Sequence, residues 1–406
     1  MGKGMVIVGG GLAGGTAAET LREEGYDGAI RIIGAEPHRP YQRPPLSKGY
    51  LAGSEGLDAV YLHDADWYRE HEIELSEGTV VASLDLSSHE VVLEDGGRVG
   101  YEKLLVATGA EARRLHIDGS DANGIHYLRT IEDSEAIRDA FAAGGKRVVL
   151  VGSGWIGLEI AAAARGHGNE ATVIGLEAVP LSGVLGDEVG RVFAELHREH
   201  GVTLLGETSV EGFEVADGRV TGVRTSQGVL PADVVVVGVG AVPNVALAEK
   251  AGLDVDHGIL VDEHLRTSGP DVYAAGDVAN ALHPFVGTRM RNEHWATAID
   301  SGKAAALSML GRDGVLDDVP YFFTDQYDLG MEYAGFPPLV RGSSVVFRGD
   351  PASREFLAFW VADGRVVAGM NVNVWDVNDD IKALITSRKL VDAARLSDPD
   401  VALADV

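Results

Sequence analysis

Met5-Val6-Ile7-Val8-Gly9-Gly10-Gly11-Leu12-Ala13-Gly14 places four apolar residues directly before a set of spaced glycines. An apolar run of this kind predicts a buried parallel strand, and the residues after it predict a helix. Gly9, Gly11 and Gly14 would form a tight turn, let the backbone approach a pyrophosphate, and allow close contact between helix and strand. The stretch therefore predicts the nucleotide-binding turn of a βαβ unit.

An acidic residue follows at the distance that this motif requires. A second apolar strand is predicted at 30–33, and Glu36 lies 22 residues after Gly14. An acid at about this spacing accepts hydrogen bonds from the ribose hydroxyls of a dinucleotide.

The same pattern returns 143 residues later. Arg147 precedes the apolar residues 148–151, and Gly152, Gly154 and Gly157 repeat the glycine spacing. A helix at 158–164 and a strand at 171–174 are predicted next. Two intact glycine sets favour two nucleotide sites over one site and a decayed copy.

Composition narrows the classes of function. The 406 residues suffice for two or three domains and contain no cysteine, which excludes disulfides, thiolate metal sites and cysteine redox centres. A net charge of −28 argues against nucleic acid or an anionic membrane surface as a partner. No apolar run approaches the ~20 residues of a membrane helix. The apolar run near the N-terminus is too short for a signal peptide and is interrupted by glycines, so we expect a cytoplasmic protein.

Other segments carry ligand-binding signals. Four prolines between residues 37 and 45 forbid a regular helix and stiffen a loop that carries Arg43 and Lys48. Residues 79–109 predict a small antiparallel sheet that ends in the turn Ala107-Thr108-Gly109. A strand at 271–275 delivers Asp277 at its carboxyl end, where open α/β sheets bind ligands. Residues 291–295 open a long predicted helix whose first turn suits an anion.

From residue 320 the sequence becomes rich in aromatic strands, and an amphipathic helix is predicted over 379–390. We therefore predict that this tail is a separate α+β domain.

In this order, the motifs resemble those of the flavin-dependent ferredoxin reductases of bacterial oxygenase systems, a group that includes putidaredoxin reductase, rubredoxin reductase and relatives of apoptosis-inducing factor. The resemblance spans essentially the whole chain. The loop Arg43-Pro44-Pro45-Leu46-Ser47-Lys48 and the tail Thr324-Asp325-Gln326-Tyr327-Asp328 are specific to this group, whereas many flavoproteins share the glycine motifs.

The resemblance implies an α/β fold of glutathione-reductase type, with two Rossmann-like dinucleotide-binding domains and a C-terminal α+β domain. It implies an FAD-binding domain at 1–113 and 242–319, an NAD-binding domain at 114–241, and a C-terminal domain at 320–406. Lys48 and Glu159 resemble the family's catalytic ion pair beside the flavin, although a structural salt bridge between two loops is the alternative. The cofactor-binding residues that it implies are Gly9, Gly11, Leu12, Ala13, Gly14, Glu36, Arg43, Lys48, Val81, Ala107, Thr108, Gly109, Arg129, Gly152, Gly154, Ile156, Gly157, Glu159, Glu177, Gly240, Gly276, Asp277, Glu293, His294, Trp295 and Phe323.

Two positions depart from the family pattern. Gly175 stands where the family usually has an acid, but Glu177 lies 20 residues after Gly157, and no Arg or Lys stands between residues 168 and 191. We therefore expect NADH to be favoured over NADPH. Phe323 stands where the family usually has Trp, so an electron exit through an indole is in doubt.

The implied activity is electron transfer from NADH through FAD to a [2Fe–2S] ferredoxin that feeds an oxygenase such as a cytochrome P450. The missing cysteines argue against the disulfide reductases and the cysteine-dependent NADH peroxidases of similar architecture. Two alternatives stay open: direct reduction of a small acceptor, of the monodehydroascorbate or quinone type, and a redox-sensing protein similar to apoptosis-inducing factor. Because ferredoxins are usually acidic, we expect a local basic rim, with candidates Arg39, Arg43, Arg289 and Arg291.

Overall fold

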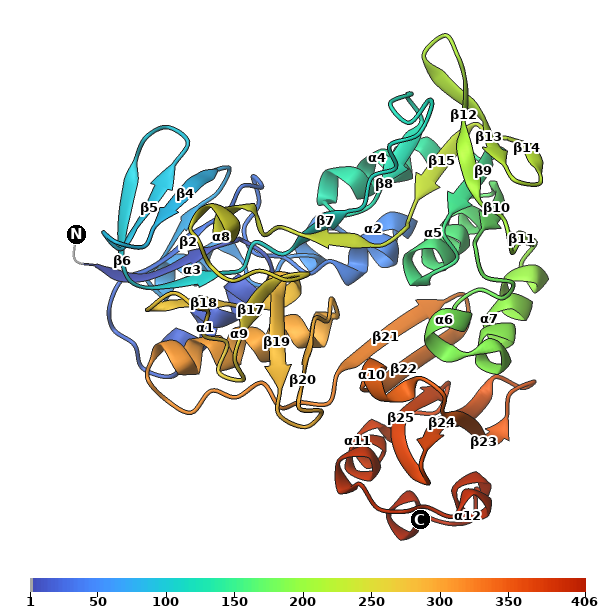
Figure 1. The fold of residues 1–406 in the computed structure, drawn as a ribbon. Coiled ribbons are helices and arrows are strands. Elements are labelled where there is room, and N and C mark those ends of the chain that lie inside the picture. Colours follow the sequence, from blue (N-terminus) through green and yellow to red (C-terminus); the bar gives the residue numbers. More distant parts are fainter. Residues whose placement is uncertain (1–2) are drawn as a thin grey trace. The chain divides into compact units, whose positions relative to one another are not determined.

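A computed structural model describes residues 3–406 and divides the chain into two compact units (Figure 1). The first unit contains the residues up to Arg43, Leu57–Glu111 and Ala241–Pro320. The second contains Pro44–Gly56, Ala112–Gly240 and Tyr321–Val406. Residues 44–56, which carry the end of the proline-rich loop, thus belong with the second unit.

The first unit is built on a seven-stranded sheet in which apolar strands are buried on both faces. Its parallel part contains β3 (Ile73–Ser76), β2 (Ile30–Ile33), β1 (Gly4–Val8), β6 (Arg98–Val106) and β18 (Val272–Ala274). The start of β6 instead pairs antiparallel with β5 (Glu90–Leu93), which pairs with β4 (Val81–Asp85). The predicted antiparallel sheet is therefore present, and its last strand also serves the parallel sheet.

Helices and a smaller sheet complete this unit. Helix α1 (Leu12–Glu23) packs closely against α9 (Trp295–Met309). The elements are α1 (Leu12–Glu23), α3 (Ala65–Glu70), α8 (Ala246–Lys250), α9 (Trp295–Met309), the sheet of β17 (Ile259–Val261), β19 (Ala279–His283) and β20 (Thr288–Met290), and the strand pair β7 (Ala110–Ala112) and β16 (Ala241–Pro243).

The second unit repeats the doubly wound pattern with five parallel strands. Their order is β11 (Val202–Leu205), β10 (Glu170–Ile174), β9 (Arg147–Val151), β15 (Val234–Val237) and β8 (Ile125–Tyr127). Beside this sheet lie α2 (Gly49–Ala52), α4 (Ile131–Phe141), α5 (Trp155–Gly166), α6 (Ser182–Leu185), α7 (Asp187–Glu199) and the antiparallel strands β12 (Val210–Ala216), β13 (Arg219–Thr225) and β14 (Gly228–Pro231).

The C-terminal segment is a five-stranded antiparallel sheet that shares a core with α5 and α7. The ring of Trp155 on α5 lies edge-on to Phe322 (5.0 Å between centroids) and to Phe193 on α7. This shared core sets the distance between α5 and β21. The segment consists of β21 (Tyr321–Gln326), β22 (Leu329–Gly335), β25 (Arg365–Val372), β24 (Glu355–Ala362), β23 (Ser344–Asp350), α10 (Pro337–Val340), α11 (Asn378–Ser387) and α12 (Ala393–Ser397).

Three helices differ in their bounds from the prediction. The helix predicted over 379–390 ends at Ser387, because Arg388 adopts a left-handed conformation (φ 51°) and the N–H of Val391 bonds to Gly364 O at 2.8 Å. That bond ties the chain to the β24–β25 turn. Helix α5 starts at Trp155, earlier than predicted, because Gly154 is its N-cap, and α9 starts only at Trp295.

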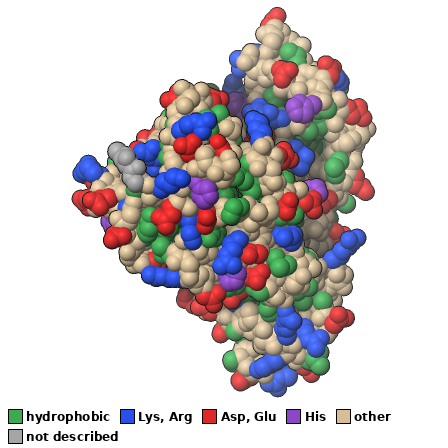
Figure 2. Space-filling model, turned by 60° about the vertical axis from the view of Figure 1, so that its left-hand side comes forward, with side chains coloured by type: hydrophobic (Ala, Val, Ile, Leu, Met, Phe, Trp, Pro, Cys, Tyr) green, Lys and Arg blue, Asp and Glu red, His purple; other side chains and the backbone are tan. Residues whose placement is uncertain are grey.

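Among residues 3–406, no helix is both long and apolar enough to cross a bilayer. Acidic and basic side chains are interspersed over the face shown in Figure 2.

The close packing of α1 and α9 depends on Gly302. A Cβ at this position would lie 2.6 Å from Ala13 O. We predict that Gly302→Ala forces the helices apart and costs about 1–3 kcal/mol, which lowers the Tm by several degrees. Gly166→Ala, at an exposed helical glycine with no neighbour within 4 Å, is the matched control and should leave the Tm unchanged or higher. Equal thermal unfolding curves for both variants would contradict the prediction.

Candidate functional site

The turn between β1 and α1 uses its glycines for two different purposes. Gly9 has φ +126°, and a Cβ there would lie 2.0 Å from Ala107 O; a Cβ at Gly14 would lie 2.2 Å from Gly9 O. Packing therefore requires both. A Cβ at Gly11, in contrast, would meet no described atom within 4 Å. The bare backbone of Gly11 faces an open side at the N-terminus of α1, where amide groups and the helix dipole favour an anion. This cradle fits a pyrophosphate.

The turn between β9 and α5 has the same construction. Gly152 has φ +113°, a Cβ at Gly157 would lie 2.0 Å from Gly152 O, and a Cβ at Gly154 would meet nothing within 4 Å. Ile156 on the first turn of α5 is 43% exposed, and Gly240 follows the neighbouring strand β15 with φ +98°. A second phosphate cradle is thus present, in the second unit.

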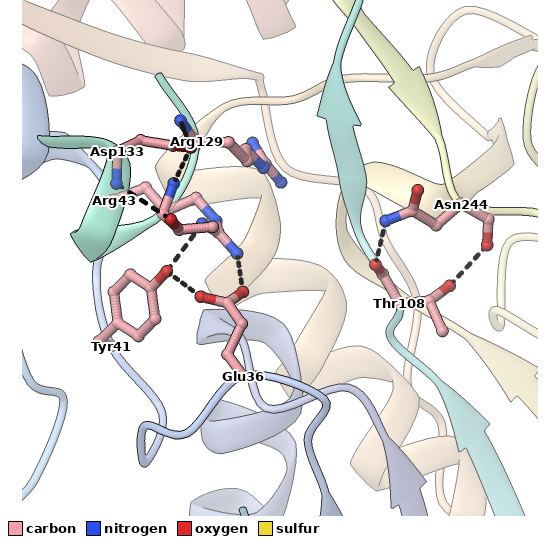
Figure 3. Close-up of polar contacts among 8 residues, drawn as sticks. Glu36, Tyr41, Arg43, Thr108, Arg129, Asp133 and Asn244 are labelled. Atoms are coloured by element: carbon pink, nitrogen blue, oxygen red, sulfur yellow. Dashed lines mark hydrogen bonds and ion pairs between the residues drawn. The ribbon is translucent and has the colours of Figure 1, made fainter. Parts of the chain in front are cut away.

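Glu36 lies just after β2 and is held by two neighbours (Figure 3). Its carboxylate accepts hydrogen bonds from the Tyr41 hydroxyl and from Arg43 Nη2, the latter at 2.9 Å. Although burial opposes its charge, Tyr41 and Glu36 raise the pKa of Arg43. A carboxylate has about four acceptor positions, so Glu36 can also accept from ribose hydroxyls.

The turn 107–109 is locked by Asn244, which the sequence analysis missed. Thr108 Oγ1 donates to Asn244 O at 2.8 Å, and Asn244 Nδ2 donates to Thr108 O at 2.9 Å (Figure 3). The backbone N–H of Asn244 also bonds to Gly109 O. Val81 is the first residue of β4 and packs, partly buried, against the hydrophobic core of the first unit.

The start of α9 gathers the remaining predicted residues of the first unit. His294 is the N-cap, and burial lowers its pKa to about 4, partly opposed by Asp277, so its imidazole is neutral at physiological pH. Trp295 Nε1 donates to Gln42 Oε1 at 2.8 Å. Glu293 is paired with Arg291, and Gly276 donates its N–H to Ser301 Oγ at 2.9 Å.

Lys48 and Glu159 form a buried ion pair in the second unit. Lys48 Nζ lies 2.6 Å from Glu159 Oε1, and the two side chains are 16% and 4% exposed. Ser47 donates its hydroxyl to Glu159 Oε2, and Thr324 donates to Oε1, both at 2.5 Å. Lys48 Nζ also lies 5.5 Å from the ring centroid of Phe323. Charge-assisted hydrogen bonds from these three donors replace the hydration that the buried carboxylate loses.

The other predicted residues of the second unit lie at the ends of its helices. The N–H groups of Arg129 and Thr130 bond to Asp133, which completes the capping box of α4 (Figure 3). Glu177 accepts from Ser182 Oγ and Gly183 N, both at 3.1 Å, and is otherwise exposed.

Gly175 explains one departure from the family pattern. A Cβ there would lie 2.2 Å from Ser153 Oγ and 2.7 Å from Ser153 Cβ. A side chain at position 175 would therefore require Ser153, between the first two glycines of the turn, to shift. Glu177 is the acid that the strand end can present in its place.

Comparison with known proteins places the chain among reductases. Residues 3–302 match the family model described as pyridine nucleotide-disulphide oxidoreductase, and residues 321–406 match the model described as reductase C-terminal. The chain is 40% identical over 401 residues to the anthranilate 1,2-dioxygenase system ferredoxin–NAD(+) reductase component of Burkholderia cepacia, covering 98% of each chain.

Two solved structures are also similar to it. One is putidaredoxin reductase in its covalent complex with putidaredoxin, with a TM-score of 0.94 and 36% identity over 99% of this chain and 97% of that chain. The other is the ferredoxin reductase for the CYP199A2 system from Rhodopseudomonas palustris, with a TM-score of 0.95 and 33% identity over 100% of both chains.

A buried histidine gives stability a pH dependence. His197 is 0% exposed, and burial lowers its pKa to about 4 from the ordinary 6.5, with His200 acting in the same direction and the hydrogen bond to Gln326 opposing. The unfolded chain therefore binds the proton more tightly, and stability is lost as the pH falls from 6.5 toward 4. Between pH 7 and pH 5 we predict a loss of about 2 kcal/mol from this group.

The measurement is urea unfolding of the wild type and of His197→Gln at both pH values. The variant should lose less stability than the wild type on acidification, because glutamine does not titrate. An equal loss in both proteins would contradict the assignment.

Proposed function

We propose an activity for this chain from one premise: the chain belongs to the pyridine nucleotide-disulphide oxidoreductase family. It is an FAD-dependent NADH:ferredoxin oxidoreductase, which passes electrons to a [2Fe–2S] ferredoxin that supplies an oxygenase such as a cytochrome P450. One observation carries the proposal: two complete glycine turns accompany a chain with no cysteine. Two dinucleotides can bind, and the chain has no dithiol to receive the electrons, so these must leave to a separate acceptor.

FAD is proposed to bind the first unit and NADH the second, in the domains 1–113 with 242–319 and 114–241. The open backbone of Gly11 would receive the FAD pyrophosphate, and Glu36 the adenosine ribose. Gly154 and Glu177 would serve the nicotinamide dinucleotide in the same way. The supporting observation in both units is the middle glycine whose Cβ would stand free.

When bound, FAD and NADH would supply the redox chemistry, namely hydride transfer and the release of single electrons. The residues of the chain position these groups and adjust the charge around them. The first-turn amides of α9 form the positive end of the helix dipole, which favours a negative charge. His294 is neutral and adds no charge of its own there. Lys48 and Glu159 are the proposed catalytic pair, with Lys48 held as a fixed cation by a carboxylate that is itself immobilised.

The proposed protein partner follows from the relatives. The similar protein of Burkholderia cepacia is named a ferredoxin–NAD(+) reductase component, and putidaredoxin reductase was solved together with putidaredoxin. All four candidate arginines bond to groups of their own unit, and Arg289 on β20 donates to Val261 O and Asn280 O. Arg289 is exposed, whereas Arg39, Arg43 and Arg291 are partly buried. Arg289 is therefore the first candidate for a basic rim toward an acidic ferredoxin. A cytoplasmic location, where NADH is supplied, completes the proposal.

The activity test uses the purified protein and its absorbance spectrum. We predict a yellow protein that NADH bleaches, and cytochrome c reduction that depends strongly on added [2Fe–2S] ferredoxin. Ready turnover of a quinone or of the ascorbyl radical would instead favour the small-acceptor reductase, and a slow, long-lived reduced complex the redox sensor. A colourless protein that takes up no FAD would overturn the proposal.

The nucleotide preference rests on Glu177. Glu177→Gln removes a charge-assisted acceptor for the ribose, so we predict that the Kd for NADH rises about tenfold, while the discrimination against NADPH becomes smaller. Glu188→Gln, an exposed acid on the nearby helix α7, is the control and should leave both values unchanged. Stopped-flow titration of flavin reduction with each nucleotide measures them, and unchanged NADH affinity in the first variant would exclude Glu177 as the ribose acceptor.

A further inference from the structure

A continuous row of hydrogen-bonded side chains runs from Glu159 into the C-terminal sheet. Thr324 Oγ1 lies 2.5 Å from Glu159 Oε1, and Gln326 Nε2 lies 3.2 Å from Thr324 Oγ1. Gln326 Oε1 then lies 2.8 Å from His197 Nε2, and His197 Nδ1 lies 3.4 Å from the Tyr327 hydroxyl. Glu159, Thr324, Gln326 and His197 are each less than 5% exposed.

The direction of every donor in this row follows from the carboxylate at its end. An ionised carboxylate only accepts, so Thr324 must donate its single hydroxyl proton to Glu159. Gln326 must then donate its N–H to Thr324, which turns its carbonyl toward His197. His197 must carry its proton on Nε2, and its Nδ1 accepts from Tyr327. All four donors thus point toward Glu159.

The charge states of the row agree with this direction. Burial lowers the pKa of His197 to about 4, so the imidazole is neutral and has one N–H and one acceptor nitrogen. Burial raises the pKa of Tyr327 to about 12, so the phenol keeps the proton that it donates. The ring of His200 stacks on Tyr327 at 3.7 Å between centroids and closes the outer end of the row.

This geometry does not suit a proton relay. Passing a proton through Gln326 would require the amide to become an imidic acid, an unfavourable tautomer. An amide that donates on one side and accepts on the other instead fixes the orientation of the groups on both sides. Its N–H fills a lone pair of Thr324 and so keeps the Thr324 hydroxyl proton aimed at the carboxylate.

We propose that Thr324, Gln326 and His197 are positioning residues for the Lys48–Glu159 pair, which they hold in one orientation through a row of donors directed at the Glu159 carboxylate. The catalytic part of this inference rests on the proposed function, whereas the row itself does not. The sequence motif Thr324-Asp325-Gln326-Tyr327 thereby gains a physical role, because alternate residues of β21 point into the core beside α5 and α7.

Charged groups near the row are few. Lys48 faces Glu159 directly. Burial raises the pKa of the neighbouring Asp325, Lys48 opposes this, and Glu159 and Glu332 add to it. At the outer end, His200 acts on His197, and Arg165 acts on Tyr327. Of these groups, the variants below change only Glu159 and His197, each as a reference for the wild type, and Gln326→Glu adds one carboxylate.

Histidine nitrogen NMR tests the direction of the row without using enzyme activity. In holoprotein labelled with ¹⁵N-histidine, we expect His197 to show a protonated Nε2 and a bare Nδ1 from pH 8 down to about 5, with the signals assigned by their loss in His197→Gln. Gln326→Glu places a carboxylate beside the ring, so His197 should become an imidazolium at pH 7. A proton on Nδ1 in the wild type would overturn the row.

Single-turnover reduction of the bound FAD by NADH tests the positioning role. Thr324→Val is expected to slow reduction about tenfold at unchanged Kd for NADH, and Thr324→Ser, which keeps the hydroxyl, to restore the rate. Thr225→Val is the control, because it removes another buried threonine hydroxyl, which bonds to Gly228 O at 2.8 Å. In a Glu159→Gln background, Thr324→Val should have little further effect.

The outcomes separate this inference from the proposed function. Equal rates in Thr324→Val and Thr225→Val, or an undiminished Thr324 effect in the Glu159→Gln background, would overturn the positioning role even if ferredoxin turnover were normal. Failure of the wild type to reduce ferredoxin would reject the proposed function and leave the NMR result on the row intact.

Discussion

The buried carboxylate of Glu159 is the constraint around which the second unit is arranged. It takes donors from Ser47, Lys48 and Thr324, which are 112, 111 and 165 residues away in the sequence. Removing a carboxylate from water costs several kcal/mol unless its oxygens are paired, so no one donor segment can be displaced without leaving a charge unsatisfied. The proline-stiffened loop, helix α5 and strand β21 are therefore fixed to one another at this point.

In each glycine turn, packing requires the outer glycines, whereas the middle glycine serves ligand binding. The outer glycines in each turn would place a Cβ within about 2.2 Å of a carbonyl oxygen, so the fold alone demands them. The middle glycines meet no such demand and leave the helix N-terminus open. The close approach of position 175 to Ser153 is a further packing demand of this kind, because a side chain at the end of β10 would have to displace the serine of the turn.

Sequence patterns predicted the fold class and the family, and the comparisons confirm both. Apolar runs before glycines were decisive, since the strand predicted at 30–33 has those bounds in the structure. Local patterns could not predict Asn244 or His197, because their roles depend on partners more than 100 residues distant. His197 lies on the buried face of an amphipathic helix, where it reads as an ordinary core position. The helix end at Ser387 depends on a tertiary bond to the β24–β25 turn, which no local signal announces.

A family named for its disulfide chemistry is represented here by a chain without cysteine. No protein thiol can store electrons or form a covalent intermediate, so the residues can influence the cofactors only through charge, hydrogen bonding and packing. Phe323 adds no hydrogen bond to these means, because its phenyl ring lies near Lys48 but has no N–H donor. In the proposed catalytic role Lys48 acts as a fixed cation, and a fixed cation requires an immobile counter-charge. The donors of Ser47 and Thr324 to Glu159 meet that requirement.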